Sequence, residues 1–407
     1  MATIVLLPLQ DHLPSVAGFS IMFIIFGVLA TYVVMRRPGM LDKVWLHPVF
    51  RAAYVFLCLS FFMESLNPAS SYTEILRTGQ MIAGAAMIAS LCRDRQALRA
   101  GLYGYIVAGI WLSVLLFLTS YGVLRGVTAT NFSDASMIRA KAFDNMPLHA
   151  NLNGMAFVSA QGAVAALAFA LNASSALRRN LFFGIALFCI IAAFLPLSRG
   201  GTVILIVSCA TVMFASGLTR GKTILLAGVI IAGVMIWVPD AVWSRMTFST
   251  QAHEGKMEGR ARVYTAAVQH LPEYVLTGVG VGNFWGPWGK RSSFAGSYGE
   301  VIGAHNCFIQ VTIYWGLAGF LVLIAVIWQA YRYFPTQCGN DVLATSLLGI
   351  AVSLLLDMLV SHNLSAKEFS LGLGFLVGAY HWIWPTGIVQ SASSERKYLR
   401  HTFRRLR

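Results

Sequence analysis

The chain has 407 residues, of which 57% are hydrophobic and 11% charged. A soluble domain is typically about 45–50% apolar and about 25% charged, so this composition excludes an ordinary water-soluble domain. It also excludes a disordered chain, which would be poor in apolar residues. Thirty Lys and Arg against sixteen Asp and Glu give a net charge of +14. In a chain embedded in lipid, this charge indicates membrane sidedness rather than nucleic-acid binding.

Apolar segments long enough to cross a bilayer as helices recur along the chain. We predict eleven spans, near residues 16–35, 46–63, 72–91, 101–121, 151–172, 181–197, 201–217, 222–239, 304–330, 342–361 and 368–385. A twelfth span within residues 1–15 is disfavoured by Asp11, His12 and two prolines. The predicted fold class is therefore an all-α polytopic membrane protein with about 11–12 transmembrane helices. Residues 1–14 contain no Lys or Arg, so we expect the first span to be retained rather than cleaved as a signal peptide.

Short basic loops mark the cytoplasmic side of a membrane protein. Seventeen Lys and Arg lie in the C-terminal tail and in loops that the predicted spans place on the same side. The opposite, outer side carries two longer loops, about 122–150 and 240–303, and this side as a whole holds eleven further cations. We therefore expect N-terminal helices over 1–239, an outer loop subdomain with an amphipathic helix over 240–303, C-terminal helices over 304–390 and a basic cytoplasmic tail over 391–407. The six cysteines are scattered without a CxxC pair, which favours neither a disulfide framework nor a zinc site.

The segment 195–201 is a tight connection between two predicted spans, and it contains Arg199. An unpaired arginine near hydrocarbon costs about 2.5–3.5 kcal/mol. Gly200 and Gly201 let the backbone turn and let a ligand approach closely. Arg199 either extends to the lipid headgroups or grips a phosphate with two parallel hydrogen bonds.

The stretch 258–272 has the apolar spacing of an amphipathic helix of about three turns that ends at its proline. Arg260 lies one turn from Tyr264 on the same face, whereas Arg262 points about 200° away from Arg260. Either arginine could equally be a solvated surface residue or part of a binding site. The run 278–284 is not a dinucleotide-binding fingerprint, because its third glycine comes one residue early and no βαβ pattern surrounds it.

His305 and Asn306 stand at the outer start of a predicted span. An ordinary histidine has a pKa of about 6.5, so it is largely neutral at pH 7 and can accept a proton. The alternative is an interfacial histidine that bonds a loop carbonyl. The other histidines of the outer side show no metal-ligand spacing, so we expect no metal site.

Asp357 lies inside the apolar segment 354–359. A carboxylate within the membrane indicates a functional site, although a structural ion pair is equally compatible with this position. Its expected partner is one of four arginines: Arg51, Arg77, Arg199 or Arg260.

In this order, the motifs resemble those of the O-antigen ligase and polymerase superfamily of bacterial inner-membrane proteins. The matching residues are Ser198-Arg199-Gly200, then Gly259-Arg260 with Tyr264 where the family often has tryptophan, the glycine-rich 278–284, and Ala304-His305-Asn306 followed by 314–319. Residues 151–154 also resemble the family. The resemblance covers most of residues 140–330.

The resemblance implies a GT-C-like fold and a multi-pass O-antigen ligase with its active site on the periplasmic face of the inner membrane. Such a ligase transfers O-antigen polysaccharide from undecaprenyl diphosphate to the lipid A–core oligosaccharide in lipopolysaccharide biosynthesis. The expected partners are therefore these two substrates and the bilayer, with no nucleic acid, no metal and no cofactor.

The residues suit that chemistry. The departing lipid diphosphate gains negative charge, which we expect Arg199 and Arg260 to stabilise. We expect His305 to be the general base for the acceptor hydroxyl, a role worth about 10²–10⁴-fold in rate, and direct displacement would invert the anomeric centre. The candidate substrate-binding residues are Asn306, Asp357, Arg262, Lys290, Arg291, Arg139, Lys141 and Tyr264.

Three alternatives remain open from the sequence. The polymerase branch of the superfamily shares the donor but elongates a lipid-linked glycan, and a further branch attaches glycans to proteins. A transporter is the alternative from another class, since Arg51, Arg77 and Asp357 within predicted spans would suit a translocation path. The sequence has no internal repeat, which is evidence against an inverted-repeat transporter.

Overall fold

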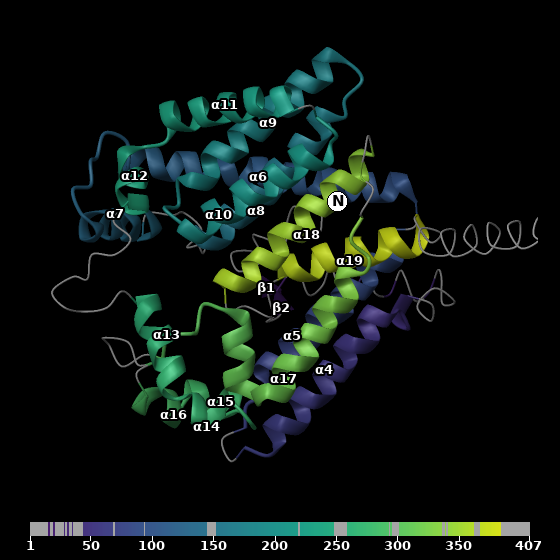
Figure 1. Ribbon diagram of the computed structural model, residues 1–407, viewed down its shortest axis with the longest axis vertical. Coiled ribbons are helices and arrows are strands. Elements are labelled where there is room, and N and C mark those ends of the chain that lie inside the picture. The colour runs from purple at the N-terminus through teal and green to yellow at the C-terminus, as the bar shows by residue number, and fades with distance from the viewer. Residues whose placement is uncertain are drawn as a thin grey trace, which may run out of the picture.

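The computed structural model describes residues 15–16, 19–20, 28, 31, 35, 44–67, 70–92, 94–144, 152–218, 220–247, 259–292, 294, 301–335, 338, 341–361 and 367–383. Within these ranges the protein is almost entirely helical (Figure 1). Two-residue strands, β1 (Ser15–Val16) and β2 (Phe19–Ser20), form a short antiparallel pair. The prediction of an all-α polytopic membrane protein is confirmed.

Ten of the described helices coincide with predicted spans: α4 (Pro48–Ser65), α5 (Thr73–Leu91), α6 (Arg95–Val123), α8 (Leu152–Leu171), α9 (Ala176–Phe194), α10 (Arg199–Ala215), α11 (Arg220–Trp237), α17 (Cys307–Tyr331), α18 (Val342–Val360) and α19 (Lys367–Trp382). Six of them, α4, α6, α8, α9, α17 and α18, are long and apolar enough to cross a membrane, whereas α10 and the apolar part of α19 are shorter. The first predicted span, 16–35, and the tail, 391–407, lie largely outside the described residues. The total of 11–12 spans therefore stays a prediction.

The helices pack as two groups that meet where α18 contacts α19 (Figure 1). One group contains α6, α8, α9, α10, α11 and α18, and the other contains α4, α5, α17 and α19. Helix α8 lies inside the first group, with 17 of its 20 residues buried. Its small residues allow close approach, since a Cβ on Gly162 would lie 2.7 Å from the Cα of Gly109 on α6.

Helix ends that the sequence assigns to the outer side lie together on one face, which we call the outer face. Short helices cover it, on the left and lower left of Figure 1: α7 (Phe132–Asp144), α12 (Asp240–Thr247), α13 (Gly259–Gln269), α14 (Leu271–Tyr274), α15 (Val281–Trp285) and α16 (Pro287–Arg291). At the opposite ends of the helices, Arg95 pairs with Asp341 at 2.6 Å, and the ring of His47 contacts that of Tyr333. The helices therefore alternate in direction as the sequence predicts.

Helix α17 is broken at Trp315 and Gly316, where the backbone leaves helical geometry. The segment that precedes α15 occupies the break: the N–H groups of Val279 and Gly280 donate to the carbonyls of Ile313 (2.8 Å) and Tyr314 (3.0 Å). Gly278 and Gly316 have φ of 75° and 64°, and a Cβ on Gly278 would overlap the Tyr314 carbonyl. The glycine-rich run thus joins the helices α13–α16, here called the outer subdomain, to a membrane helix by backbone contacts.

Candidate functional site

The motif residues 198–201 form the start of α10. The Ser198 hydroxyl accepts a hydrogen bond from the Gly201 N–H (3.2 Å) and caps the helix. The glycines permit close packing, since a Cβ on Gly200 would lie 3.1 Å from the side chain of Val360 on α18. A Cβ on Gly201 would lie 3.2 Å from Ala156 on α8. Arg199 is therefore held at the outer end of α18.

Two other arginines fix the connection before α10. Arg139 on α7 donates to the Pro196 carbonyl (3.1 Å) and to Asn153 Oδ1 (2.7 Å). Arg245 on α12 donates to the Leu197 carbonyl (2.9 Å), and its own carbonyl accepts from Arg199 Nε (3.2 Å). Leu197 itself has a left-handed backbone, with φ of 58°. Such strain costs about 1–3 kcal/mol and marks sites where the surroundings fix the chain.

Arg260 extends from the outer subdomain to the outer end of α18. It lies in the first turn of α13, and its Nη2 is 3.4 Å from the carbonyl oxygen of Val360. That carbonyl is at the C-terminal end of α18, where the helix dipole favours cations. Burial lowers the pKa of the Arg139 guanidinium, and the charge of Arg260 lowers it further. The two guanidinium groups are thus close enough to repel, which favours an anion beside them.

The predicted amphipathic helix is shorter than the sequence suggested. Helix α13 ends at Gln269, and Pro272 lies in the first turn of the separate helix α14. The prediction of one helix to Pro272 is wrong at this end, because proline is accommodated in the first turn of a helix as well as after its last. Tyr264, on α13, packs half-buried against the apolar core of the outer subdomain.

His305 and Asn306 precede α17 and complete this arrangement. Asn306 is the N-cap: its Oδ1 accepts from the N–H groups of Phe308 (3.0 Å) and Ile309 (3.1 Å). Its Nδ2 donates to the carbonyl of Leu359 (3.2 Å), beside Val360. His305 has a left-handed backbone with φ of 49°, an uncommon geometry for a residue other than glycine. His305 is thus held next to the outer end of α18.

Asp357 lies one turn before that end of α18 and is near enough to Cys307 to interact with it electrostatically. Of its four expected partners, two are engaged elsewhere. Arg51 donates to the Leu46 carbonyl (2.7 Å), and Arg77 pairs with Glu74 (2.8 Å). Among the described residues, no group of three or more His, Cys, Asp or Glu is placed to hold a metal ion.

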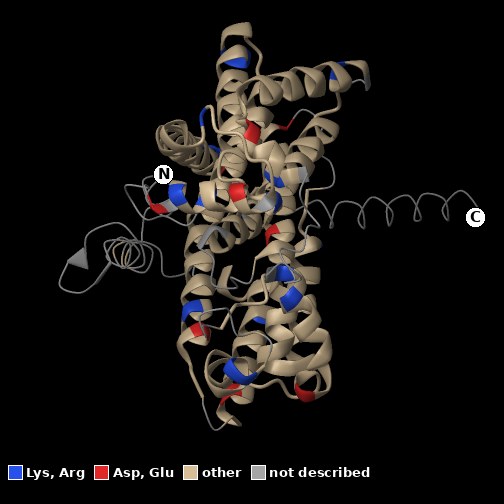
Figure 2. Ribbon diagram, turned by 90° about the vertical axis from the view of Figure 1, so that its left-hand side faces the viewer, with Lys and Arg blue, Asp and Glu red and all other residues tan. Residues whose placement is uncertain are grey.

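The sequence-predicted residues therefore separate into two sets. One set lies around the outer end of α18 and consists of Arg139, Arg199, Arg260, Asn306 and Asp357, with His305 next to Asn306. Figure 2, in which the left-hand side of Figure 1 faces the viewer, shows Lys and Arg at several heights on this side, some of them near the middle.

Lys290 and Arg291, two of the remaining predicted residues, lie apart from this cluster. Lys290 and Arg291 are exposed on α16, which lies beside α15 and away from α10 and α12 (Figure 1). Lys141 is exposed on α7, and Arg262 is half-buried on α13.

Glu64 is a structural residue of this face that the sequence analysis missed. It is fully buried at the end of α4, and its carboxylate accepts from the N–H groups of Ser71 (2.7 Å), Val281 (2.8 Å) and Gly282 (3.3 Å). These bonds fix the start of α15. The only signal in the sequence was an acidic residue at the end of an apolar span.

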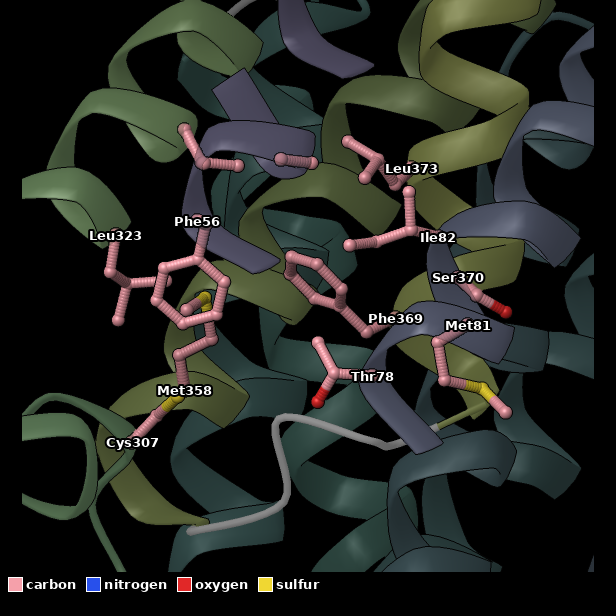
Figure 3. Close-up of a pocket in the computed structure, with 12 residues that line it drawn as sticks. Phe56, Thr78, Met81, Ile82, Cys307, Leu323, Met358, Phe369, Ser370 and Leu373 are labelled. Carbon is pink, nitrogen blue, oxygen red and sulfur yellow. The ribbon is translucent and has the colours of Figure 1, made fainter. Parts of the chain in front are cut away.

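An apolar cavity adjoins the cluster on its membrane side. It lies between α4, α5, α17, α18 and α19 and has an empty volume of about 580 Å³, which includes its open side. Cys307 and Met358, the neighbours of Asn306 and Asp357, line one side of it, where Phe56 also lies, and Phe369 lines it further along (Figure 3). A second apolar cavity shares Met358 and Phe369 and continues between α17, α18 and α19 towards Phe334.

Together these features define a polytopic helical membrane protein with an arginine-rich site at one end of its helices and an apolar cavity beside that site. Residues 184–324 match the family model described as O-antigen ligase. The matched stretch contains Arg199, Arg260 and His305, and it agrees with the resemblance to the O-antigen ligase and polymerase superfamily. No curated protein matches the chain.

Proposed function

We propose that this protein is an O-antigen ligase, which transfers a glycan from a polyprenyl diphosphate donor to the lipid A–core acceptor on the periplasmic face of the inner membrane. The observation that carries the proposal is that Arg260 and Asn306 donate to the last carbonyls of α18, while Gly200, the neighbour of Arg199, packs against Val360 there. These residues come from three segments far apart in the chain, and each belongs to a motif of the superfamily.

The proposed reaction is a direct displacement. The oxygen of an acceptor hydroxyl attacks the anomeric carbon, the bond from that carbon to the diphosphate oxygen breaks, and His305 takes the hydroxyl proton. The leaving diphosphate gains negative charge, which Arg199 and Arg260 stabilise with charge-assisted hydrogen bonds. The product then has an inverted anomeric centre. Arg139 adds positive charge beside Arg260, and Asp357 orients the groups around it.

The apolar cavity supports a lipid-linked donor. A polyprenyl diphosphate has an anionic headgroup and a long apolar chain, and the cavity begins two residues from His305, at Cys307. We place the first isoprene units in this cavity, so that the diphosphate lies among the arginines.

The test uses purified protein with lipid-linked glycan and lipid A–core, scored by the gel shift of the product. We expect His305→Ala to lower turnover by about 10²-fold or more while donor binding is retained. Arg199→Ala and Arg260→Ala should weaken donor binding, whereas Arg125→Ala, which removes an exposed cation of the outer side next to Tyr121, should leave both unchanged. Near-normal turnover in His305→Ala would exclude it as the base.

The same assay separates the branches of the superfamily. A ligase requires lipid A–core as acceptor, whereas a polymerase lengthens the lipid-linked glycan when lipid A–core is omitted. We expect transfer to need lipid A–core and to persist in EDTA. Chain growth without lipid A–core would identify a polymerase, and loss of activity in EDTA would contradict the metal-independent reaction.

A further inference from the structure

Gln310 holds the backbone immediately before His305. It is fully buried on α17, and its Oε1 accepts a hydrogen bond of 2.7 Å from the N–H of Ala304. Ala304 is also fully buried, so its N–H has no access to bulk water and needs a partner within the protein. Gln310 supplies that partner from six residues further along the chain.

His305 needs support on both sides because its backbone is left-handed, with φ of 49°. A residue with a Cβ persists in this region only where its surroundings fix it. On the C-terminal side, Asn306 caps α17 and donates to Leu359. On the N-terminal side, the bond from Ala304 to Gln310 is the corresponding constraint.

Gln310 lies one turn before Tyr314 on α17, and Tyr314 contacts the outer subdomain through its hydroxyl. That hydroxyl accepts a hydrogen bond of 2.7 Å from Trp285 Nε1 on α15. The backbone carbonyl of Tyr314 accepts from Gly280 in the docked glycine-rich segment. Gln310 is therefore one turn from the residue through which the outer subdomain docks on α17.

We propose that Gln310 is a positioning residue for the transfer reaction and acts by fixing the backbone that presents the His305 imidazole. This inference rests on the proposed function, because it takes His305 as the general base. A displacement of about 1 Å in a reacting group lowers a rate by on the order of 10²-fold. Loss of the Gln310 bond should therefore reduce turnover rather than donor binding.

The decisive variants are Gln310→Met, which removes the acceptor at similar volume, and Gln310→Glu, which keeps an oxygen acceptor. We expect Gln310→Met to lower kcat by about tenfold or more with the KM for donor changed less than about threefold. Gln310→Glu should recover most of this loss. The matched control is Thr312→Val on the same helix, because in the described part of the chain the Thr312 hydroxyl donates to the Phe308 carbonyl of its own helix. If Gln310→Met does not fold, Gln310→Asn replaces it, since its shorter side chain withdraws the oxygen.

A double-mutant cycle tests whether Gln310 acts through His305. Added to His305→Ala, Gln310→Met should cause no further loss of residual transfer and no loss of donor affinity. Unchanged kcat in Gln310→Met, no recovery in Gln310→Glu, or a further loss in the double variant would overturn the inference.

Amide hydrogen exchange separates this inference from the proposed function, because it needs no substrate. Exchange at Ala304 should accelerate in Gln310→Met and not in Thr312→Val. Unchanged exchange would overturn the inference even if the wild-type protein is a ligase. Absence of glycan transfer by the wild-type protein would overturn the proposed function, and accelerated exchange would still establish the constraint on the loop.

Discussion

Single residues of the outer face are placed by contacts over long distances in the sequence. Glu64 is the clearest example, because one carboxylate satisfies three backbone N–H groups and links α4 to α15. Hydrogen bonds to a charged acceptor contribute more than neutral ones, and removing the charge leaves buried donors poorly satisfied.

We predict that Glu64→Gln lowers the free energy of unfolding by roughly 2–3 kcal/mol. The control is Glu74→Gln, which breaks the exposed pair with Arg77 and should cost about 0–1 kcal/mol. Denaturant unfolding of both variants in the same detergent measures the difference. Equal losses would show that the Glu64 carboxylate is not the link described here.

The sequence identified the residues whose chemistry is unusual for their surroundings. Arg199, Arg260 and His305 stand out because charged or titratable side chains are rare beside apolar spans. Glu64 and Gln310 could not be found in this way, because their partners are backbone N–H groups, which every residue but proline has. For Glu64 and Val281, the two partners are 217 positions apart. Lys290 and Arg291 were included for their charge alone, and the fold places them on α16, on the outer face but away from the arginine cluster.

At the scale of elements, the break in α17 joins the outer subdomain to the membrane helices. Gly316 has φ of 64°, and a Cβ there would overlap the carbonyl oxygen of Leu276. We predict that Gly316→Ala lowers the free energy of unfolding by about 2 kcal/mol or more, from backbone strain and overpacking together.

Gly184→Ala is the matched control, because Gly184 lies within α9, and among the described residues no atom outside its own stretch of helix lies within 4 Å of an added Cβ. Alanine favours helix over glycine by about 0.5–1 kcal/mol, so this variant should be as stable as the wild type or more so. Thermal unfolding of both variants in one detergent provides the comparison. If Gly316→Ala loses no more stability than Gly184→Ala, the close packing of the outer subdomain against the break in α17 is contradicted.

Hydropathy was sufficient to locate the helices, since ten predicted spans coincide with ten described helices. It could not reveal the break in α17, because Trp315 and Gly316 lie within a continuous apolar run. The break depends on hydrogen bonds with residues 275–280, which belong to a different segment: the Leu317 N–H donates to the Val275 carbonyl, and Val279 and Gly280 donate to α17. The end of α13 was misplaced for a local reason, since a proline is compatible with either end of a helix.

At the scale of the whole molecule, the two faces differ in what they hold. The outer face carries the arginine cluster, and the other ends of the helices carry the pair of Arg95 with Asp341. We predict that the outer face is periplasmic, because the short basic loops lie on the opposite side.

Cysteine labelling in intact cells tests this orientation. Lys290→Cys, exposed on α16, should react with a membrane-impermeant maleimide from outside the inner membrane. Leu177→Cys, at the other end of α9 and 81% exposed, should react only after the membrane is disrupted. The native cysteines described as buried should stay unlabelled, and a reversed pattern would place the site in the cytoplasm.

The enclosure of α8 also bears on how this protein is made. A segment enters the bilayer during synthesis because its own residues are sufficiently apolar, and α8 is long and apolar enough to do so. Yet almost none of its surface remains in lipid once its neighbours have assembled, so its apolar residues serve insertion first and packing afterwards. Because α9 and α10 follow α8 in the chain, α8 is inserted before these packing partners have been synthesised. Substitutions along α8 will therefore affect two separate stages of biogenesis, membrane entry and later assembly, which yield and stability measurements can distinguish.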